Sequence, residues 1–166
     1  RRWEIIRGQG DLPVVHLPAL QEQEERGRWT EQIDTRCAIL SNESGRYLAL
    51  PLEWRFRFEK PGEGEALGWQ GADFDDSAWP TLKTSLPWEK QGYADVDGVG
   101  WYRVAFDVPA DKAAADHAVL RFGAVDESSW AWLNGEKLGE FLFDVDKDPE
   151  SWSKPLDYVV TGRLKP

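Results

Sequence analysis

The sequence contains no methionine, one cysteine and two histidines among its 166 residues. A lone cysteine cannot form an internal disulfide, and Cys37 lies in a short apolar run, where we expect a small core residue. His16 and His117 stand in unrelated contexts, which argues against a metal site or a catalytic triad built on histidine. Basic residues are fewer than acidic ones, 20 against 30, and the net charge of −10 repels phosphate backbones. We therefore expect no nucleic-acid partner.

Long apolar runs are missing as well. No stretch approaches the roughly 18 consecutive apolar residues that a membrane span needs. The residues after Arg1 lack the apolar region and small-residue cleavage site of a secretory signal, so any signal would lie upstream. The hydrophobic content of 41% with 30% charged residues is typical of a globular chain. We expect one domain with an additional arm and no contact with a membrane.

Tryptophan, by contrast, is abundant, with 10 residues in the chain. Part of this aromatic content alternates with charge: Trp54, Phe56 and Phe58 are separated by Arg55 and Arg57, the period of two that marks a half-buried strand. Similar β-rich runs follow between Pro, Gly or Asp turns, at residues 101–108, 117–122, 129–133, 137–143 and 156–160.

Turn and helix signals complete the prediction of an all-β domain. Asn134-Gly135 between two of the runs is a strong hairpin signal. Only residues 111–116, with three alanines, favour a helical turn, which is too short to form a layer. Residues 1–49 mix short Pro-interrupted runs with a charged stretch, and we interpret them as an extended arm from a preceding region that packs on residues 50–166. Their Ser41–Gly45 cluster suggests a further hairpin.

Four segments in this order resemble a known family: LPLEWRFRFEKPGEGEALGWQGADFDDSAWPTL, GVGWYRVAFDVP, LRFGAVDESSWAWLNGEKLGE and PLDYVVTGRLKP. Together they are similar to the sugar-binding domain of family 2 glycoside hydrolases, which include the β-galactosidase-like enzymes. The resemblance covers about residues 50–166. It implies a β-sandwich jelly roll with the galactose-binding-domain-like fold, and it would continue past Pro166 into one more strand, which we expect this chain to lack.

The resemblance also implies what the chain does and does not do. In this family the catalytic acid and nucleophile lie on a separate barrel domain, so we expect no catalytic residue here and a catalytic domain of the parent chain as partner. We expect an accessory module that binds an oligo- or polysaccharide; the alternative is a purely structural sandwich packed against the catalytic domain. As part of a secreted enzyme, the module would lie outside the cell or in the periplasm.

The residues themselves suggest a place for the sugar, because indole and phenol rings stack on pyranose C–H faces while hydroxyls need amide and carboxylate partners. Trp88 and Tyr93 offer rings on a Gly-punctuated loop, where binding residues are commonly displayed. Polar partners would come from the same loop, namely Glu89, Gln91, Asp95 and Asp97. Trp88 could equally plug the end of the sandwich.

A second aromatic feature is the pair Trp130 and Trp132, which alternation places on one face of a strand, with Ala131 and Leu133 on the other. We expect the small and aliphatic residues to face the core. Trp130 and Trp132 then form an outer strip that either binds a glycan or is covered by the arm or another domain. Exposed apolar patches usually mark interfaces, which favours coverage.

Alternating carboxylates suggest a structural calcium ion, since acidic side chains two apart can converge on one hard cation. Asp144, Asp146 and Asp148 form the first candidate. Asp73, Asp75 and Asp76 form a weaker one. Against the first, Pro149 stands where a calcium loop of the helix–loop–helix type has glycine, and a hydrogen-bonded acidic turn remains the alternative for both.

Overall fold

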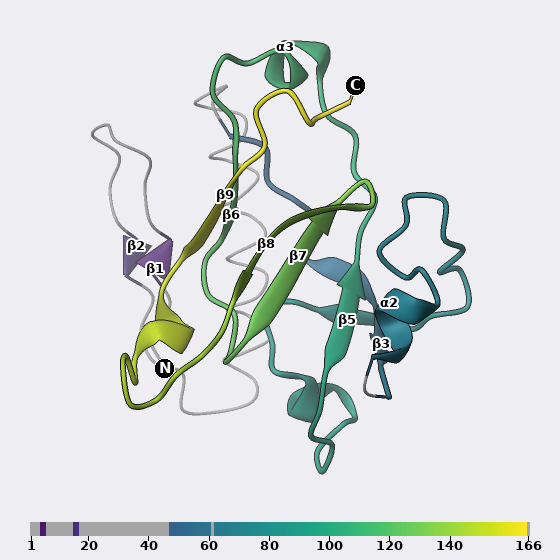
Figure 1. Ribbon diagram of the computed structural model, residues 1–166, viewed down its shortest axis with the longest axis vertical. Coiled ribbons are helices and arrows are strands. Elements are labelled where there is room, and N and C mark those ends of the chain that lie inside the picture. The colour runs from purple at the N-terminus through teal and green to yellow at the C-terminus, as the bar shows by residue number, and fades with distance from the viewer. Residues whose placement is uncertain (1–3, 6–14, 17–46, 61, 166) are drawn as a thin grey trace. The chain divides into compact units, whose positions relative to one another are not determined.

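A computed structural model describes residues 4–5, 15–16, 47–60 and 62–165. Within these residues the chain is all-β, as predicted, and its strand content agrees with a β-sandwich (Figure 1). The jelly-roll connectivity stays a prediction. The chain divides into two compact units, Arg28–Val108 and the pair Arg1–Gly27 with Pro109–Pro166. Predictions for the arm, its packing and its hairpin at residues 41–45 lie almost entirely outside the described residues.

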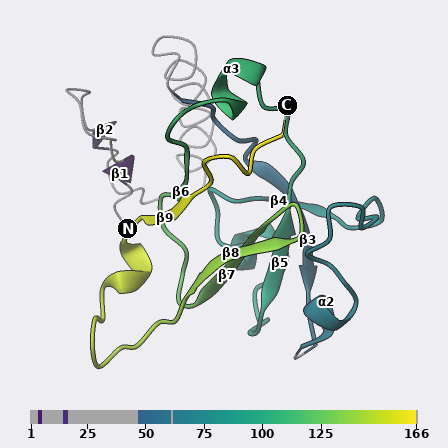
Figure 2. The same cartoon turned by 45° about the horizontal axis from the view of Figure 1, so that its top comes forward.

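The unit Arg28–Val108 contains one three-stranded antiparallel sheet. Its order is β4 (Thr81–Lys83), β3 (Glu53–Phe58) and β5 (Gly100–Arg103), with β3 in the centre (Figure 2). A one-turn helix, α2 (Glu63–Ala66), and a 3₁₀ turn, η1 (Trp88–Gln91), lie in its connections. The sequence predicted β3 and β5 but missed β4, which is only three residues long.

The other unit contains small antiparallel sheets of two strands each. They are the pairs β1 (Glu4–Ile5) with β2 (Val15–His16), β6 (Val119–Phe122) with β9 (Leu156–Val159), and β7 (Ser129–Leu133) with β8 (Glu136–Phe141). The helical turn predicted for residues 111–116 is α3 (Ala110–Ala113), and a 3₁₀ turn, η2 (Ser151–Ser153), precedes β9. No helix among the described residues is long and apolar enough to cross a membrane.

The β7–β8 hairpin turns at Asn134-Gly135, as the sequence predicted. Both residues have positive φ, 51° and 85°, the backbone that a two-residue turn needs to match the twist of its strands. Asparagine and glycine adopt this backbone at low cost, so the turn fixes where the hairpin folds back.

One face of the central sheet carries the Phe56 cluster, which we define as Phe56, Phe58, Trp88, Tyr93 and Tyr102. Phe56 is fully buried and lies opposite Tyr102 in the β3–β5 register. Its ring centroid is 4.8 Å from that of Tyr102, 5.3 Å from that of Tyr93 and 6.1 Å from that of Trp88. Burial of several rings against one another supplies a large share of a small core's stability.

The opposite face of the same sheet carries the Trp69 cluster, defined as Trp69, Phe74, Trp79 and Trp101. Trp69 and Trp79 are only 2% and 4% exposed, and their centroids are 4.9 Å apart. The guanidinium of Arg57 lies over both rings, 5.2 Å and 5.9 Å from their centroids. Both faces of β3 are therefore covered, because the segment after β3 packs on the face that carries its charged residues.

In the second unit, small residues make room for an aromatic ring under the hairpin. Ala131 pairs with Gly139, and a Cβ added at Gly139 would lie 2.9 Å from Tyr158 Cε1 on β9. Tyr158 also packs edge-on against Phe122, with centroids 6.0 Å apart. The inner face of the hairpin is thus the one with Ala131, as predicted from its size.

The close approach at Gly139 gives a direct test of this packing. We expect Gly139→Val to lower the free energy of unfolding by about 1–3 kcal/mol, because the new side chain must displace the Tyr158 ring. Thermal or urea unfolding of the whole chain measures it. Gly123→Ala is the matched control, since its added Cβ meets nothing within 4 Å. Equal stability of Gly139→Val and the parent would show that the hairpin does not rest on Tyr158.

Candidate functional site

The two rings predicted to stack on sugar, Trp88 and Tyr93, lie in the Phe56 cluster. The Trp88 ring centroid is 5.0 Å from that of Phe58, and the Tyr93 centroid is 5.2 Å from it. Trp88 begins the η1 turn directly after Pro87, whose extended backbone leads into it. The geometry agrees with the alternative weighed from the sequence, in which Trp88 closes the end of the core.

The amide predicted to bind hydroxyls from this loop, Gln91, is hydrogen-bonded to backbone. Gln91 Oε1 accepts from Lys83 N at 2.8 Å, while Gln91 Nε2 donates to Lys83 O at 2.9 Å and to Leu86 O at 3.1 Å. These bonds fasten the 3₁₀ turn to strand β4. A sugar hydroxyl would have to compete with three existing bonds, which disfavours a binding role for this amide.

Three carboxylates of the loop, those of Glu89, Asp95 and Asp97, are exposed. Burial, and to a smaller extent the charge of Glu89, raises the pKa of Tyr102 to about 12. Asp95 and Asp97 stand in a stretch that also exposes Val96. The loop therefore exposes its acids, while its half-buried rings pack against Phe58, so the rings and the acids that the sequence combined do not form one open surface.

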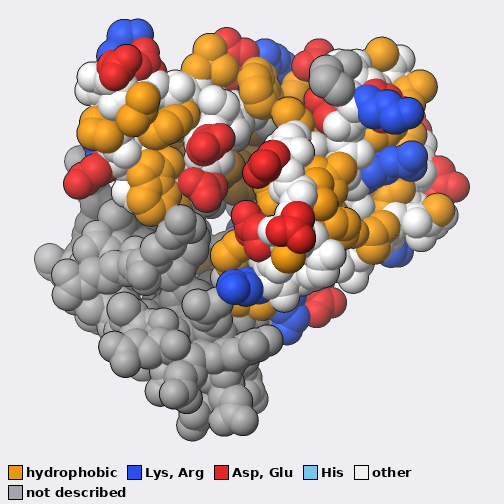
Figure 3. Space-filling model, turned by 90° about the horizontal axis from the view of Figure 1, so that it is seen from below, with side chains coloured by type: hydrophobic (Ala, Val, Ile, Leu, Met, Phe, Trp, Pro, Cys, Tyr) orange, Lys and Arg blue, Asp and Glu red, His pale blue; other side chains and the backbone are white. Residues whose placement is uncertain are grey.

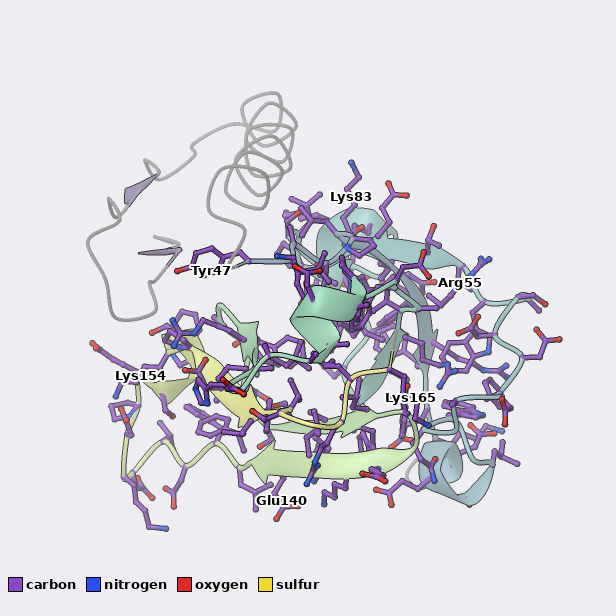
Figure 4. All side chains as sticks on the ribbon, turned by 90° about the horizontal axis from the view of Figure 1, so that it is seen from above. Tyr47, Arg55, Lys83, Glu140, Lys154 and Lys165 are labelled. Atoms are coloured by element: carbon purple, nitrogen blue, oxygen red, sulfur yellow. The ribbon has the colours of Figure 1, made fainter. Side chains whose placement is uncertain are left out.

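The outer face of the β7–β8 hairpin combines both kinds of group. Trp130 is 38% exposed and lies opposite Glu140 in the register. The Glu140 carboxylate accepts a hydrogen bond from Lys137 Nζ at 2.7 Å. Figure 4 shows Glu140 on the side of the hairpin away from β9. We call Trp130, Lys137 and Glu140 the hairpin surface.

Lys137 stabilises the charged form of the Glu140 carboxylate. The hydrogen bond and positive charge of Lys137, with a smaller effect of the Trp130 N–H, lower the pKa of Glu140 below its ordinary value. Lys137 Nζ is also 6.0 Å from the centroid of the Trp132 ring. An exposed indole face beside one acceptor and one cationic donor is the combination that pyranose recognition needs.

The carboxylates of the first predicted calcium site already accept hydrogen bonds or pair with lysines of the same chain. Asp144 accepts from Asp146 N at 3.1 Å and pairs with Lys147 Nζ at 2.6 Å, and Asp148 pairs with Lys154. Each lysine lowers the pKa of its partner's carboxyl. Among the described residues, no group of three or more His, Cys, Asp or Glu side chains is placed to hold a metal ion.

In the weaker calcium candidate, an arginine side chain and a backbone N–H group contact the carboxylates. Asp76 Oδ2 accepts from Arg103 Nε at 2.9 Å, and Asp75 accepts from Ser77 N at 3.0 Å. Neither acidic turn therefore supports the calcium prediction, because in each of them basic side chains or backbone N–H groups already contact the carboxylates. The exposed His117 also lies in no such group.

Sequence reasoning missed Arg103, which holds the loop of the Trp69 cluster. Its guanidinium donates to the carbonyls of Trp69, Gly71 at 3.1 Å and Phe74 at 3.4 Å, in addition to Asp76. The side chain is 16% exposed. The planar guanidinium of arginine can donate to several acceptors at once, so Arg103 fixes the long connection between β3 and β4.

A comparison with known protein families identifies the family of this chain. A family model described as the β-galactosidase second all-beta domain matches residues 64–165, more than half of the chain. The chain belongs to this family. Membership agrees with the resemblance to accessory β-domains of family 2 glycoside hydrolases. No curated protein matches the sequence.

Solved structures of β-glucuronidases share the fold of this chain. A β-glucuronidase of Ruminococcus gnavus is 18% identical, with a TM-score of 0.51 over 69% of this chain and 18% of that one. A Lactobacillus rhamnosus β-glucuronidase is 19% identical, with a TM-score of 0.51 over 71% of this chain and 20% of that one. A calcium binding mutant of Bacteroides uniformis β-glucuronidase 2 is 21% identical, with a TM-score of 0.53 over 71% and 13%. The chain thus spans a fifth or less of these enzymes.

Proposed function

We propose that this chain is a non-catalytic carbohydrate-binding module of a multidomain glycoside hydrolase, and that it binds glycan through the hairpin surface. Its membership of an accessory all-β family supports a place beside a catalytic domain. In a secreted enzyme the module would act outside the cell or in the periplasm. The observation that carries the proposal is the exposed Trp130 ring, which lies opposite a Glu140 carboxylate that is paired with Lys137.

The hairpin surface suits a sugar because its parts are fixed before binding. The β7–β8 pairing places Trp130 directly opposite Glu140, and the hydrogen bond between Lys137 and Glu140 holds the two polar groups in place. Polar side chains that are already held by a hydrogen bond lose less side-chain entropy when a ligand binds. Polar groups within one hydrogen bond of the ring can then select among hydroxyl arrangements.

A test of the function removes the ring alone. We expect Trp130→Ala to weaken binding to a neutral polysaccharide by roughly 5- to 150-fold, since stacking on an aromatic ring is worth about 1–3 kcal/mol in the comparable case of nucleobases. Affinity electrophoresis in gels cast with single polysaccharides measures it. Leu142→Ala is the matched control, because Leu142 is 59% exposed just beyond β8. Unchanged mobility of Trp130→Ala on a polymer that retards the parent would place the site elsewhere.

A purely structural module is the second candidate, and one surface favours it. Val119 and Val159 lie opposite each other at the end of the β6–β9 pair and are 40% and 62% exposed. Exposed apolar pairs of this kind are common at interfaces between domains. If the isolated chain binds no polysaccharide while Val159→Ser weakens its association with the rest of the parent enzyme, the structural role is the correct one.

A further inference from the structure

The polar half of the hairpin surface exists because of a β-bulge. Along β7 and β8, Ala131 pairs with Gly139 but Trp132 pairs with Lys137, so one residue of β8, Leu138, has no opposite partner. Residues three apart on a regular strand point to opposite faces. The extra residue reverses that parity, which puts Lys137 and Glu140 on the same side, where their charged groups meet at 2.7 Å.

We propose that the hairpin surface takes a neutral pyranose with two adjacent hydroxyls, and that Lys137 and Glu140 together determine this specificity. The inference rests on the proposed function. Lys137 Nζ donates to one hydroxyl oxygen and Glu140 accepts the O–H of its neighbour, while the Trp130 face covers the C–H groups of the sugar ring. Adjacent ring hydroxyls have oxygens about one hydrogen-bond length apart, which matches the Lys137–Glu140 separation of 2.7 Å.

Charge explains why the sugar is neutral. The charge of Lys137 is compensated by Glu140, so the ion pair offers no net positive charge to a ligand. A uronic acid carboxylate would meet an ammonium that Glu140 already neutralises and a carboxylate that repels it. The chain as a whole carries a net charge of −10, which repels polyanions at long range. Acidic side chains are also scattered among hydrophobic ones on the face drawn in Figure 3.

Each polar group keeps hydrogen-bonding capacity for a ligand. An ammonium has three donors, and one of them serves Glu140. A carboxylate has about four acceptor sites, of which Lys137 uses one. Both side chains of the ion pair are close to half exposed, 46% and 47%, so a ligand reaches them without opening the sheet.

The experiment compares neutral polymers with a polyuronate on the full chain. Affinity electrophoresis in galactan, xylan, mixed-linkage β-glucan and polygalacturonate tests the ligand class. We expect retardation by at least one neutral polymer, none by polygalacturonate, and a dissociation constant that changes less than about threefold between low and high salt, because no net charge is neutralised on binding.

Variants then test the two polar residues. Lys137→Gln and Glu140→Gln should each weaken neutral binding about tenfold, since each loses a charge-assisted hydrogen bond to a hydroxyl. The exchanged pair Lys137→Glu with Glu140→Lys should retain most of the affinity, because hydroxyls both donate and accept. Lys147→Gln, which breaks an exposed pair outside the hairpin, is the control. Near-ultraviolet circular dichroism confirms that each variant is folded.

The outcomes separate this inference from the proposed function. Binding of polygalacturonate that Trp130→Ala abolishes would keep the module and its surface but overturn the neutral-sugar inference. Neutral binding that Trp130→Ala abolishes and both glutamine variants leave unchanged would overturn the roles of Lys137 and Glu140. Retardation by no polymer at all would overturn both.

Discussion

Arg103→Lys is expected to lower the free energy of unfolding by about 3 kcal/mol. The guanidinium serves three carbonyls and the Asp76 carboxylate from a position that is 16% exposed, and a lysine ammonium cannot reach this set of acceptors at once. The carbonyls left behind would be unsatisfied or would need water, and breaking a largely buried charge network typically costs several kcal/mol. Urea unfolding with the linear extrapolation measures the change.

The control for this substitution is Arg121→Lys, which affects an arginine of similar reach. Arg121 pairs with Asp157 across β6 and β9, but both side chains are more exposed, at 33% and 43%. An ion pair of this kind contributes less than about 1 kcal/mol. A loss of stability in Arg121→Lys equal to that in Arg103→Lys would mean that the carbonyl contacts of Arg103 contribute nothing specific.

Trp88→Ala is expected to destabilise the chain by about 3 kcal/mol, the lower end of the range for large aromatic residues in cores. The ring contacts Phe56 and Phe58, and a Cβ added at Gly100 would lie 3.1 Å from Trp88 Cζ3, so the site is closely packed. Thermal unfolding followed by circular dichroism checks the prediction.

Trp88→Phe separates ring packing from hydrogen bonding at the same position. Trp88 Nε1 is buried and has no hydrogen-bond partner within the described residues, so phenylalanine loses no bond there. We expect Trp88→Phe to retain most of the stability that Trp88→Ala loses. If Trp88→Ala were as stable as the parent, the Phe56 cluster would not be the core of this sheet, and the loop would be free to serve a ligand.

Much of the fold could be predicted because local patterns agree with it. The period of two marks β3, and Asn134-Gly135 has the positive φ values that its turn requires. Trp69 and Trp79 lie within the first segment that carries the family resemblance, and both are buried. The short β4 carries too few residues for any periodicity, so its pairing with β3 comes from tertiary contacts that a sequence pattern does not express.

The candidate site was less accessible to sequence reasoning, for two physical reasons. Composition showed that Trp88 and Gln91 have the right chemistry for a sugar, but whether a side chain faces solvent or core depends on what packs behind it. The partnership of Lys137 with Glu140 depends on the bulge at Leu138, and strict alternation would place the two on opposite faces. Of the sequence-predicted ligands, Trp130 is the one that the structure brings together with polar groups.

The most direct test of the account compares Trp130→Ala with Trp88→Phe on one neutral polysaccharide that retards the parent chain. Each substitution removes one indole ring. Trp130 lies on the hairpin surface, whereas Trp88 lies in the Phe56 cluster. Dissociation constants come from affinity electrophoresis over a range of polymer concentrations, on protein shown to be folded. The account predicts a roughly 5- to 150-fold weaker affinity for Trp130→Ala and an unchanged affinity for Trp88→Phe. Normal binding by Trp130→Ala together with lost binding by folded Trp88→Phe would contradict it and place the glycan on the loop.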